Sequence, residues 1–119
     1  MRDSYREQLD DILADLVQMS QVVSSAVRSS TTALLEADIH LAEQVIGDDA
    51  KLDAKQADIE ARAFTLLARQ SPVAGELRTL VATLRMVTEL ERMGDLAAHV
   101  AKIARLRYPE TAVPRSPSG

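Results

Sequence analysis

The sequence predicts an all-α protein, an up-down-up bundle of three helices. Apolar residues recur at steps of three and four through three long segments, which is the period of a helix with one buried face. The composition agrees, because alanine and leucine abound and aromatic residues make up only 3% of the chain. Very short connections separate the segments, near Asp38 and Pro72, so neighbouring helices must run antiparallel.

The first predicted helix runs from Asp3 to about Glu36. Its apolar positions form the seam of an antiparallel bundle or coiled coil. These positions are Leu9, Ile12, Leu16, Met19, Val23, Ala26, Ser30 and Ala33. Further apolar residues widen the stripe enough to contact two neighbouring helices, which favours a bundle over a simple pair. They are Leu13, Val17, Val27 and Leu34.

The second predicted helix begins after Asp38, which we expect to cap it, and extends to about Gln70. Gly47 interrupts the apolar pattern, and we expect a kink in a continuous helix there. The helix ends at Ser71, because the residue before Pro72 is pushed out of the helical region. Its apolar face consists of Ile39, Ala42, Val45, Ile46, Leu52, Ile59, Ala63, Leu66 and Leu67.

The third predicted helix starts at Pro72 or Val73 and ends at Arg107, before Tyr108-Pro109. We therefore expect a helical domain over residues 1–108 and a linker-like or disordered tail over residues 109–119. The apolar positions Leu77, Leu80, Leu84 and Val87 lead on to Glu91, Gly94 and Ala98. A glycine inside a helix costs about 1 kcal/mol relative to alanine, so a close helix contact is expected at that glycine. Met19, Met86 and Met93 are interpreted as core filler.

Composition excludes several classes of function. The net charge is -4 and the pI is near 5.1, without a clustered basic face, which argues against nucleic-acid binding. No cysteine is present, so disulfides, thiolate metal sites and catalytic thiols are excluded. The first residues do not resemble a signal peptide, and no stretch reaches 18 uncharged apolar residues. We expect a cytoplasmic protein that contacts membranes only through partners.

Two acidic pairs are the candidate site: Asp49 with Asp53, and Glu91 with Asp95. Both pairs lie about 20 residues from the second connection, which is roughly 30 Å along a helix. Antiparallel neighbours would therefore bring four carboxylates to one height, where they could hold divalent or trivalent cations. The alternative interpretation is a solvated acidic face, since such spacings arise often by chance in a chain with 27% charged residues.

The neighbours of these acids supply little positive charge. Arg92 is the only cation within one turn of Asp95, and Arg85 is placed to neutralise Glu89. His99 continues the acidic row and could add a nitrogen ligand, although pairing with Asp95 is the favoured interpretation. Neither histidine belongs to a Glu-x-x-His pair, which argues against a di-iron carboxylate enzyme.

The segments Val45-Ile46, Asp49, Leu52-Asp53, Pro72 to Arg78, Glu89 to Asp95 and Ile103-Ala104 carry a family resemblance. Over nearly all of residues 3–108 they resemble the amino-terminal half of the PhoU family, the phosphate-signalling regulators of bacteria. The resemblance implies tandem three-helix repeats whose acidic motifs bind iron or zinc, and in some members magnesium or manganese. By matching position, it implies Asp49, Asp53, Glu91 and Asp95 as metal ligands. Gln56 stands where family members often have an acid, which would weaken or shrink the cluster.

The resemblance also implies a function. The expected role is negative regulation of phosphate uptake and of the phosphate regulon, as an adaptor between the phosphate ABC transporter and a sensor histidine kinase. We expect no enzymatic activity. The sequence holds one repeat, so we expect a truncated or a naturally half-length family member, with an exposed apolar flank that forms a homodimer. The alternative is a metal-free structural or dimerising bundle, and a di-iron enzyme is less favoured.

Overall fold

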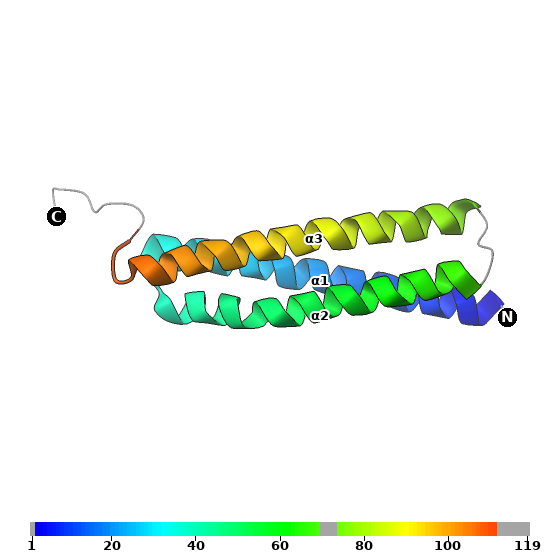
Figure 1. The fold of residues 1–119 in the computed structure, drawn as a ribbon, viewed down its shortest axis with the longest axis horizontal. Coiled ribbons are helices and arrows are strands. Elements are labelled where there is room, and N and C mark those ends of the chain that lie inside the picture. The colour runs from blue at the N-terminus through cyan, green and yellow to red at the C-terminus, as the bar shows by residue number, and fades with distance from the viewer. Residues whose placement is uncertain (1, 70–73, 112–119) are drawn as a thin grey trace.

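Three long helices make up the structure, a computed structural model that describes residues 2–69 and 74–111. They are α1 (Arg2–Glu36), α2 (Ile39–Arg69) and α3 (Ala74–Arg107). The helices lie side by side along one axis, and each runs antiparallel to the helix before it (Figure 1). The described residues contain no strand, so the predicted all-α up-down-up bundle is confirmed. The predicted start of the third helix at Pro72 or Val73 lies outside the described residues.

A tight turn joins α1 to α2. Ala37 has a φ of 56°, the left-handed conformation that ends many helices, and the amide of Asp38 donates to the carbonyl of Ala33 at 3.1 Å. The amide of Leu41 then donates to Oδ1 of Asp38, also at 3.1 Å. Asp38 therefore caps α2 as predicted. α2 continues through Gly47 without a break, which confirms continuity, while the kink stays a prediction.

Large side chains fill most of the length of the core, and alanines fill one end. The first group includes Tyr5, Leu9, Ile12, Leu16, Met19, Val23, Leu52, Ile59, Leu66, Leu80 and Val87. The second consists of Ala33, Ala42, Val45, Ala97, Ala101 and Ala104, near the α1–α2 turn. Small residues let helix backbones approach closely, so α3 can pack tightly there. The two acidic pairs lie where the large-residue core gives way to the alanine core.

The predicted apolar stripe of α1 is confirmed at almost every position, but several flanking predictions were wrong. Val17 is 55% exposed, although it was expected to contact a neighbouring helix. Leu77 is 43% exposed, and Met86 and Met93 are 51% and 46% exposed instead of filling the core. A helix in a three-helix bundle is covered on one side only, so residues at the edge of its apolar stripe stay in water.

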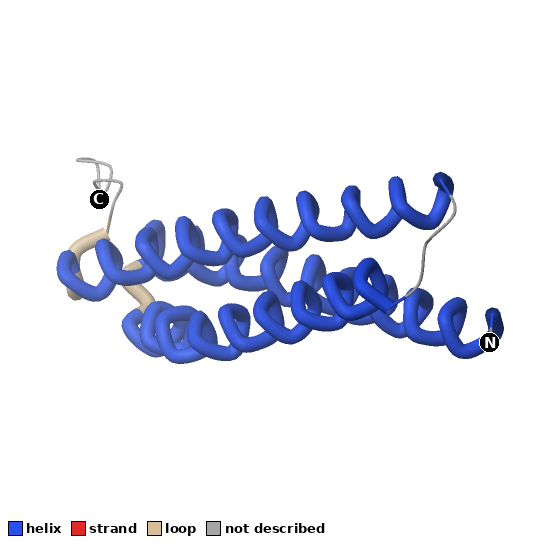
Figure 2. The backbone as a smooth tube through the Cα atoms, turned by 45° about the vertical axis from the view of Figure 1, so that its right-hand side comes forward, coloured by secondary structure: helices blue, strands red, loops and turns tan. Residues whose placement is uncertain are grey.

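A second view, turned by 45°, shows the same side-by-side arrangement of the three helices (Figure 2). None of the described helices combines the length and the apolar character that a bilayer crossing requires. The described chain reaches Thr111, and residues 112–119 of the expected tail lie outside it. The division at residue 108 stays a prediction.

Candidate metal site

The structure brings the two acidic pairs together between α2 and α3. One carboxylate oxygen each from Asp49, Asp53 and Asp95 lie within 4.8 Å of one another. Asp49 is half-buried, and the other two side chains are exposed. These distances agree with the sequence prediction that both pairs lie at the same level along the bundle. Antiparallel helices place Asp53 opposite Glu91 and Asp49 opposite Asp95.

Glu91 lies against the same group of carboxylates. Burial, together with the neighbouring Asp95 and Asp53, raises its pKa to about 7. A carboxyl group beside other carboxylates resists ionisation because like charges repel in a partly desolvated position. Glu91 therefore interacts with the charges of the cluster. Near neutral pH up to three negatively charged carboxylates surround it.

Asp49 shows the same pattern. Burial raises its pKa, and the charges of Asp53 and Asp95 raise it further. Lys102 is the one group that lowers it. Raised pKa values in both acidic pairs indicate a site that lacks sufficient positive charge of its own.

The cations nearest in sequence are engaged elsewhere. Nη1 of Arg92 lies 2.9 Å from Oε1 of Glu89, so Arg92 pairs with this residue and not with an acid of the cluster. The predicted neutralisation of Glu89 by Arg85 was wrong, because Arg92 pairs with Glu89 and the ion pairs of the described residues do not include Arg85. Nζ of Lys51 lies 3.5 Å from Oδ1 of Asp48, again outside the cluster.

His99 was expected to pair with Asp95, and this expectation was wrong. The side chain of His99 is exposed, and the ion pairs among residues 2–69 and 74–111 do not include it. On α3 it lies one helical turn beyond Asp95, and it is not among the residues whose ligand atoms lie within 4.8 Å of one another. The ligand set offered by the cluster is therefore made of oxygen atoms.

Close packing of α3 on α2 positions the cluster. Gly94 is buried between Met93 and Asp95, and a Cβ atom added to it would lie 3.0 Å from Cδ1 of Leu52. Such a distance leaves no room for a larger side chain unless Leu52 moves. The close helix contact that the sequence predicts at Gly94 is confirmed, and it holds the two acidic pairs at adjacent heights.

A cavity adjoins the cluster on its α1 side. A cavity of about 390 Å³ opens between α1 and α2, and Asp49, Leu52 and Gly94 are among its lining residues. The α1 side of this cavity is polar, with Gln18, Ser25 and Ser29 among the contributors. A cation held by the carboxylates could therefore complete its coordination with water.

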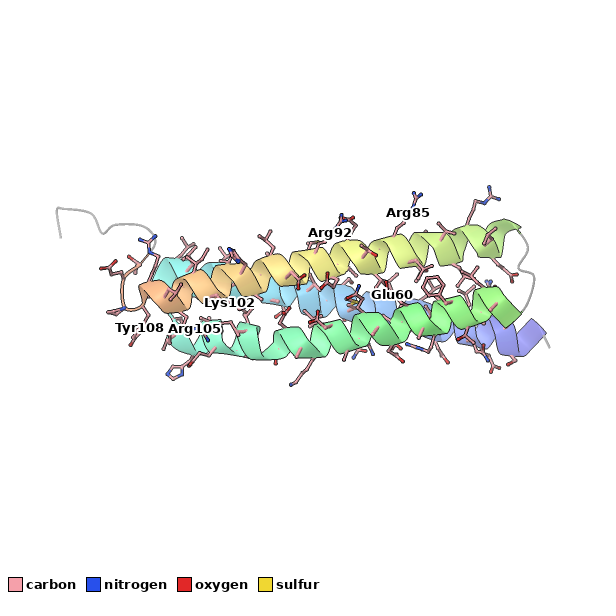
Figure 3. The ribbon with its side chains drawn as sticks, viewed as in Figure 1. Glu60, Arg85, Arg92, Lys102, Arg105 and Tyr108 are labelled. Carbon is pink, nitrogen blue, oxygen red and sulfur yellow. The ribbon has the colours of Figure 1, made fainter. Side chains whose placement is uncertain are left out.

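Sequence reasoning missed Lys102. The residue lies seven positions after Asp95, two helical turns along the same row of α3, and a search limited to one turn does not reach it. In Figure 3, Lys102 and Arg105 lie on the side of α3 that faces α2. A search at two turns would have found this lysine.

The donor set fits a hard cation. Carboxylate oxygens are the ligands that Mg²⁺, Mn²⁺ and iron accept readily, and clustered carboxylates lose their mutual repulsion when a cation binds. A bound ion would supply positive charge at the α2–α3 interface. Asp49, Asp53, Glu91 and Asp95 are the residues that would hold it.

Comparisons with known proteins agree with the fold. The family model described as the PhoU domain matches residues 16–104. The chain is 48% identical over 119 residues to the phosphate-specific transport system accessory protein PhoU homolog 2 of Mycobacterium tuberculosis, covering all of this chain and 56% of that protein. It is 46% identical over 119 residues to PhoU homolog 1 of Mycobacterium leprae, covering 54% of that protein.

A solved structure gives the same result. The crystal structure of PhoU from Pseudomonas aeruginosa superposes with a TM-score of 0.88 at 32% sequence identity, covering 93% of this chain and 53% of that one. The chain thus spans about half the length of the curated relatives and of the solved structure that it matches. These relatives are named as accessory proteins and not as enzymes. On the strength of the domain match, the sequence identity and the shared fold, the chain belongs to the PhoU family.

Proposed function

We propose that this protein is an accessory regulator of phosphate transport, acting as a negative regulator of phosphate uptake and of the phosphate regulon. Family membership supports the proposal, together with the names of the mycobacterial relatives as accessory proteins of the phosphate-specific transport system. The long, exposed helix faces suit a protein that docks others and performs no chemistry itself. Its place is in the cytoplasm, beside the membrane proteins that it regulates.

The partners in this proposal are the phosphate ABC transporter and a sensor histidine kinase. A rigid three-helix rod can contact two proteins at once along different faces, which is what an adaptor requires. The exposed apolar residues of α3, including Leu77 and Val81 at 43% and 41% exposure, support docking or self-association on that helix. We propose a homodimer, and sedimentation as a monomer at high concentration would contradict it.

The acidic cluster is the proposed metal site of the regulator. The single observation that carries this part is the meeting of three carboxylates from two helices within 4.8 Å, with Glu91 beside them, while Arg92 and Lys51 pair with other acids. A bound iron, manganese, zinc or magnesium ion would remove the repulsion between the two acidic pairs. The ion would stiffen the α2–α3 interface and change the charge of one face of the rod.

Metal analysis tests the proposal directly. The variant combines Asp49→Asn, Asp53→Asn, Glu91→Gln and Asp95→Asn. The control has the same change in net charge at four exposed acids elsewhere: Glu7→Gln, Asp11→Asn, Glu36→Gln and Glu43→Gln. We expect stoichiometric metal by plasma mass spectrometry in the wild type and the control, and none in the site variant. A ligand present at a hundred times its Kd should stabilise the folded state by about 2.7 kcal/mol.

Regulation is tested in cells that lack their own family member and carry a phosphate-regulated reporter. The wild-type chain and the control should lower reporter expression in high phosphate, and the site variant should fail to do so. If both variants repress equally while only the wild type and control bind metal, the metal is not needed for regulation. If no form of the protein binds metal, the metal-free structural bundle is the correct interpretation.

A further inference from the structure

Lys102 occupies an unusual place beside the acidic cluster. It comes from α3, on the side that faces α2, and its charge acts on Asp49 of the neighbouring helix (Figure 3). The ion pairs within residues 2–69 and 74–111 do not include Lys102. Lys102 is thus an exposed side chain beside the cluster that forms none of these ion pairs, and its positive charge opposes the rise in the pKa of Asp49.

Helix geometry explains how the two residues reach each other. Side chains on a helix lean toward its N-terminus, so Lys102 leans back along α3 toward Asp95. α2 runs in the opposite direction, so Asp49 leans toward the same end of the bundle as the base of Lys102. Between them on α3 lies Ala98, which is buried and small, so no bulky side chain of that row blocks the lysine.

From this arrangement we propose that Lys102 is the internal counter-cation of the acidic cluster, which occupies the edge of the site when metal is absent and lowers its affinity for metal. The inference rests on the proposed function, because it concerns the same four carboxylates. An ammonium group beside a carboxylate cluster repels an incoming divalent ion, and its long flexible stem lets it move away once the ion has bound.

The expected size of the effect follows from charge and distance. Removing one positive charge beside a divalent ion in a partly solvated site should tighten metal binding about three- to tenfold. The effect should fall with distance, because charges separated by more than about 8 Å are screened at physiological salt. Arg105 offers a matched control, since it lies on the same side of α3, one turn further from the acids.

The experiment compares Lys102→Gln, Lys102→Arg and Arg105→Gln with the wild type in the full chain. Each protein is stripped of metal and titrated with Mn²⁺ by isothermal titration calorimetry at physiological salt. We expect Lys102→Gln to bind Mn²⁺ three- to tenfold more tightly than the wild type. The arginine variant, which keeps the charge, and the Arg105→Gln control should stay within twofold of the wild type.

Other results would overturn the inference in distinguishable ways. Equal or weaker Mn²⁺ binding by Lys102→Gln, with normal binding by the wild type, would overturn the role of Lys102 and leave the metal site standing. A similar gain in Arg105→Gln would show a general effect of net charge and overturn the position-specific role. Absence of Mn²⁺ binding in all four proteins would overturn the proposed metal site and this inference together.

Discussion

α2 contributes to two charged clusters, one with α1 around Asp15 and one with α3, the acidic cluster. The half-buried carboxylate of the first has cationic partners, and within residues 2–69 and 74–111 the half-buried carboxylates of the second form no ion pair. Asp15 of α1 meets two cations from α2: Nζ of Lys55 lies 3.5 Å from its Oδ1, and Arg62 donates a hydrogen bond to its Oδ2. That hydrogen bond holds the pKa of Asp15 below its ordinary value. Arg62 also pairs with Asp58 at 3.0 Å.

The acidic cluster differs from the Asp15 cluster in its partners more than in its burial. Asp49 is half-buried, as Asp15 is, but the pKa of Asp49 is raised where that of Asp15 is lowered. The Asp15 cluster contains its own counter-charges, so it acts within the fold as a link between α1 and α2. The acidic cluster has one loosely placed lysine for four carboxylates and is suited to a cation from solution.

The largest expected effect comes from separating the helices beneath the acidic cluster. Gly94→Leu would place a side chain against Leu52, where even a single Cβ would lie at 3.0 Å from Cδ1. Overpacking of this kind should destabilise the fold by about 2–3 kcal/mol in urea unfolding and abolish metal binding. The contact of Arg62 with Asp15 should survive, because Arg62 lies ten residues beyond Leu52 along α2. Unchanged stability and metal binding would show that the close approach is not needed.

A smaller effect distinguishes the two clusters: removing one carboxylate should lower the free energy of unfolding in the Asp15 cluster and raise it in the acidic cluster. Asp15→Asn should destabilise the metal-free protein by about 1–2 kcal/mol, because it leaves Arg62 and Lys55 without their shared partner. Asp53→Asn should stabilise the metal-free protein by a few tenths of a kcal/mol, because it relieves repulsion among the acids. Urea unfolding in chelator measures both. Destabilisation by both substitutions would mean that the clusters are alike.

A third difference between the two clusters is the pH dependence of stability. Glu91 has its pKa raised from 4.5 to about 7, so its contribution to stability is fully present below 4.5 and lost as pH rises through about 7. Asp15 has its pKa lowered, so its contribution is present above its ordinary 3.8 and lost as pH falls further. The metal-free protein should therefore be most stable near pH 5.

Two variants test which residue causes the loss of stability on each side of pH 5. The measurement is the urea midpoint of unfolding from pH 3 to 8. Glu91→Gln should flatten the decline above pH 5 and leave the acid limb unchanged. Asp15→Asn should flatten the decline at low pH and leave the other limb unchanged. A wild-type profile that rises continuously from pH 5 to 8 would contradict the assignment of Glu91.

The sequence was sufficient for the helices and for the height of the acidic pairs, because both depend on local chemistry and on simple geometry. Asp38 can cap the helix that follows it through its own side chain, and a proline disfavours the helical conformation of the residue before it. Given two antiparallel helices with a short connection, equal spacing from that connection brings Asp53 opposite Glu91. The structure confirmed the Asp38 cap and the close contact at Gly94, whereas the predicted end of the second helix at Ser71 lies outside the described residues.

Partner choice among charged residues could not be predicted, because long side chains have several carboxylates within reach. Arg92 can turn toward Glu89 or toward Asp95, and the bundle geometry decides which one it meets. The exposure of Met86 and Met93 was also missed. The spacing of apolar residues shows where the centre of a buried helix face lies, but it shows less reliably how far that face extends to either side. Lys102 acts across helices, and such contacts depend on the relative rotation of α2 and α3.

The position of the acidic cluster in the chain has a consequence for folding kinetics. Asp53 and Glu91 are 38 residues apart in sequence and meet far from the connection that joins their helices. A hairpin of two helices that closes from its connection would bring these like charges together late, after most apolar contacts have formed. A cation that binds only the closed arrangement would then leave the rate of folding almost unchanged and slow unfolding. Metal would act on the lifetime of the assembled α2–α3 pair, and so on how long any surface built from both helices persists.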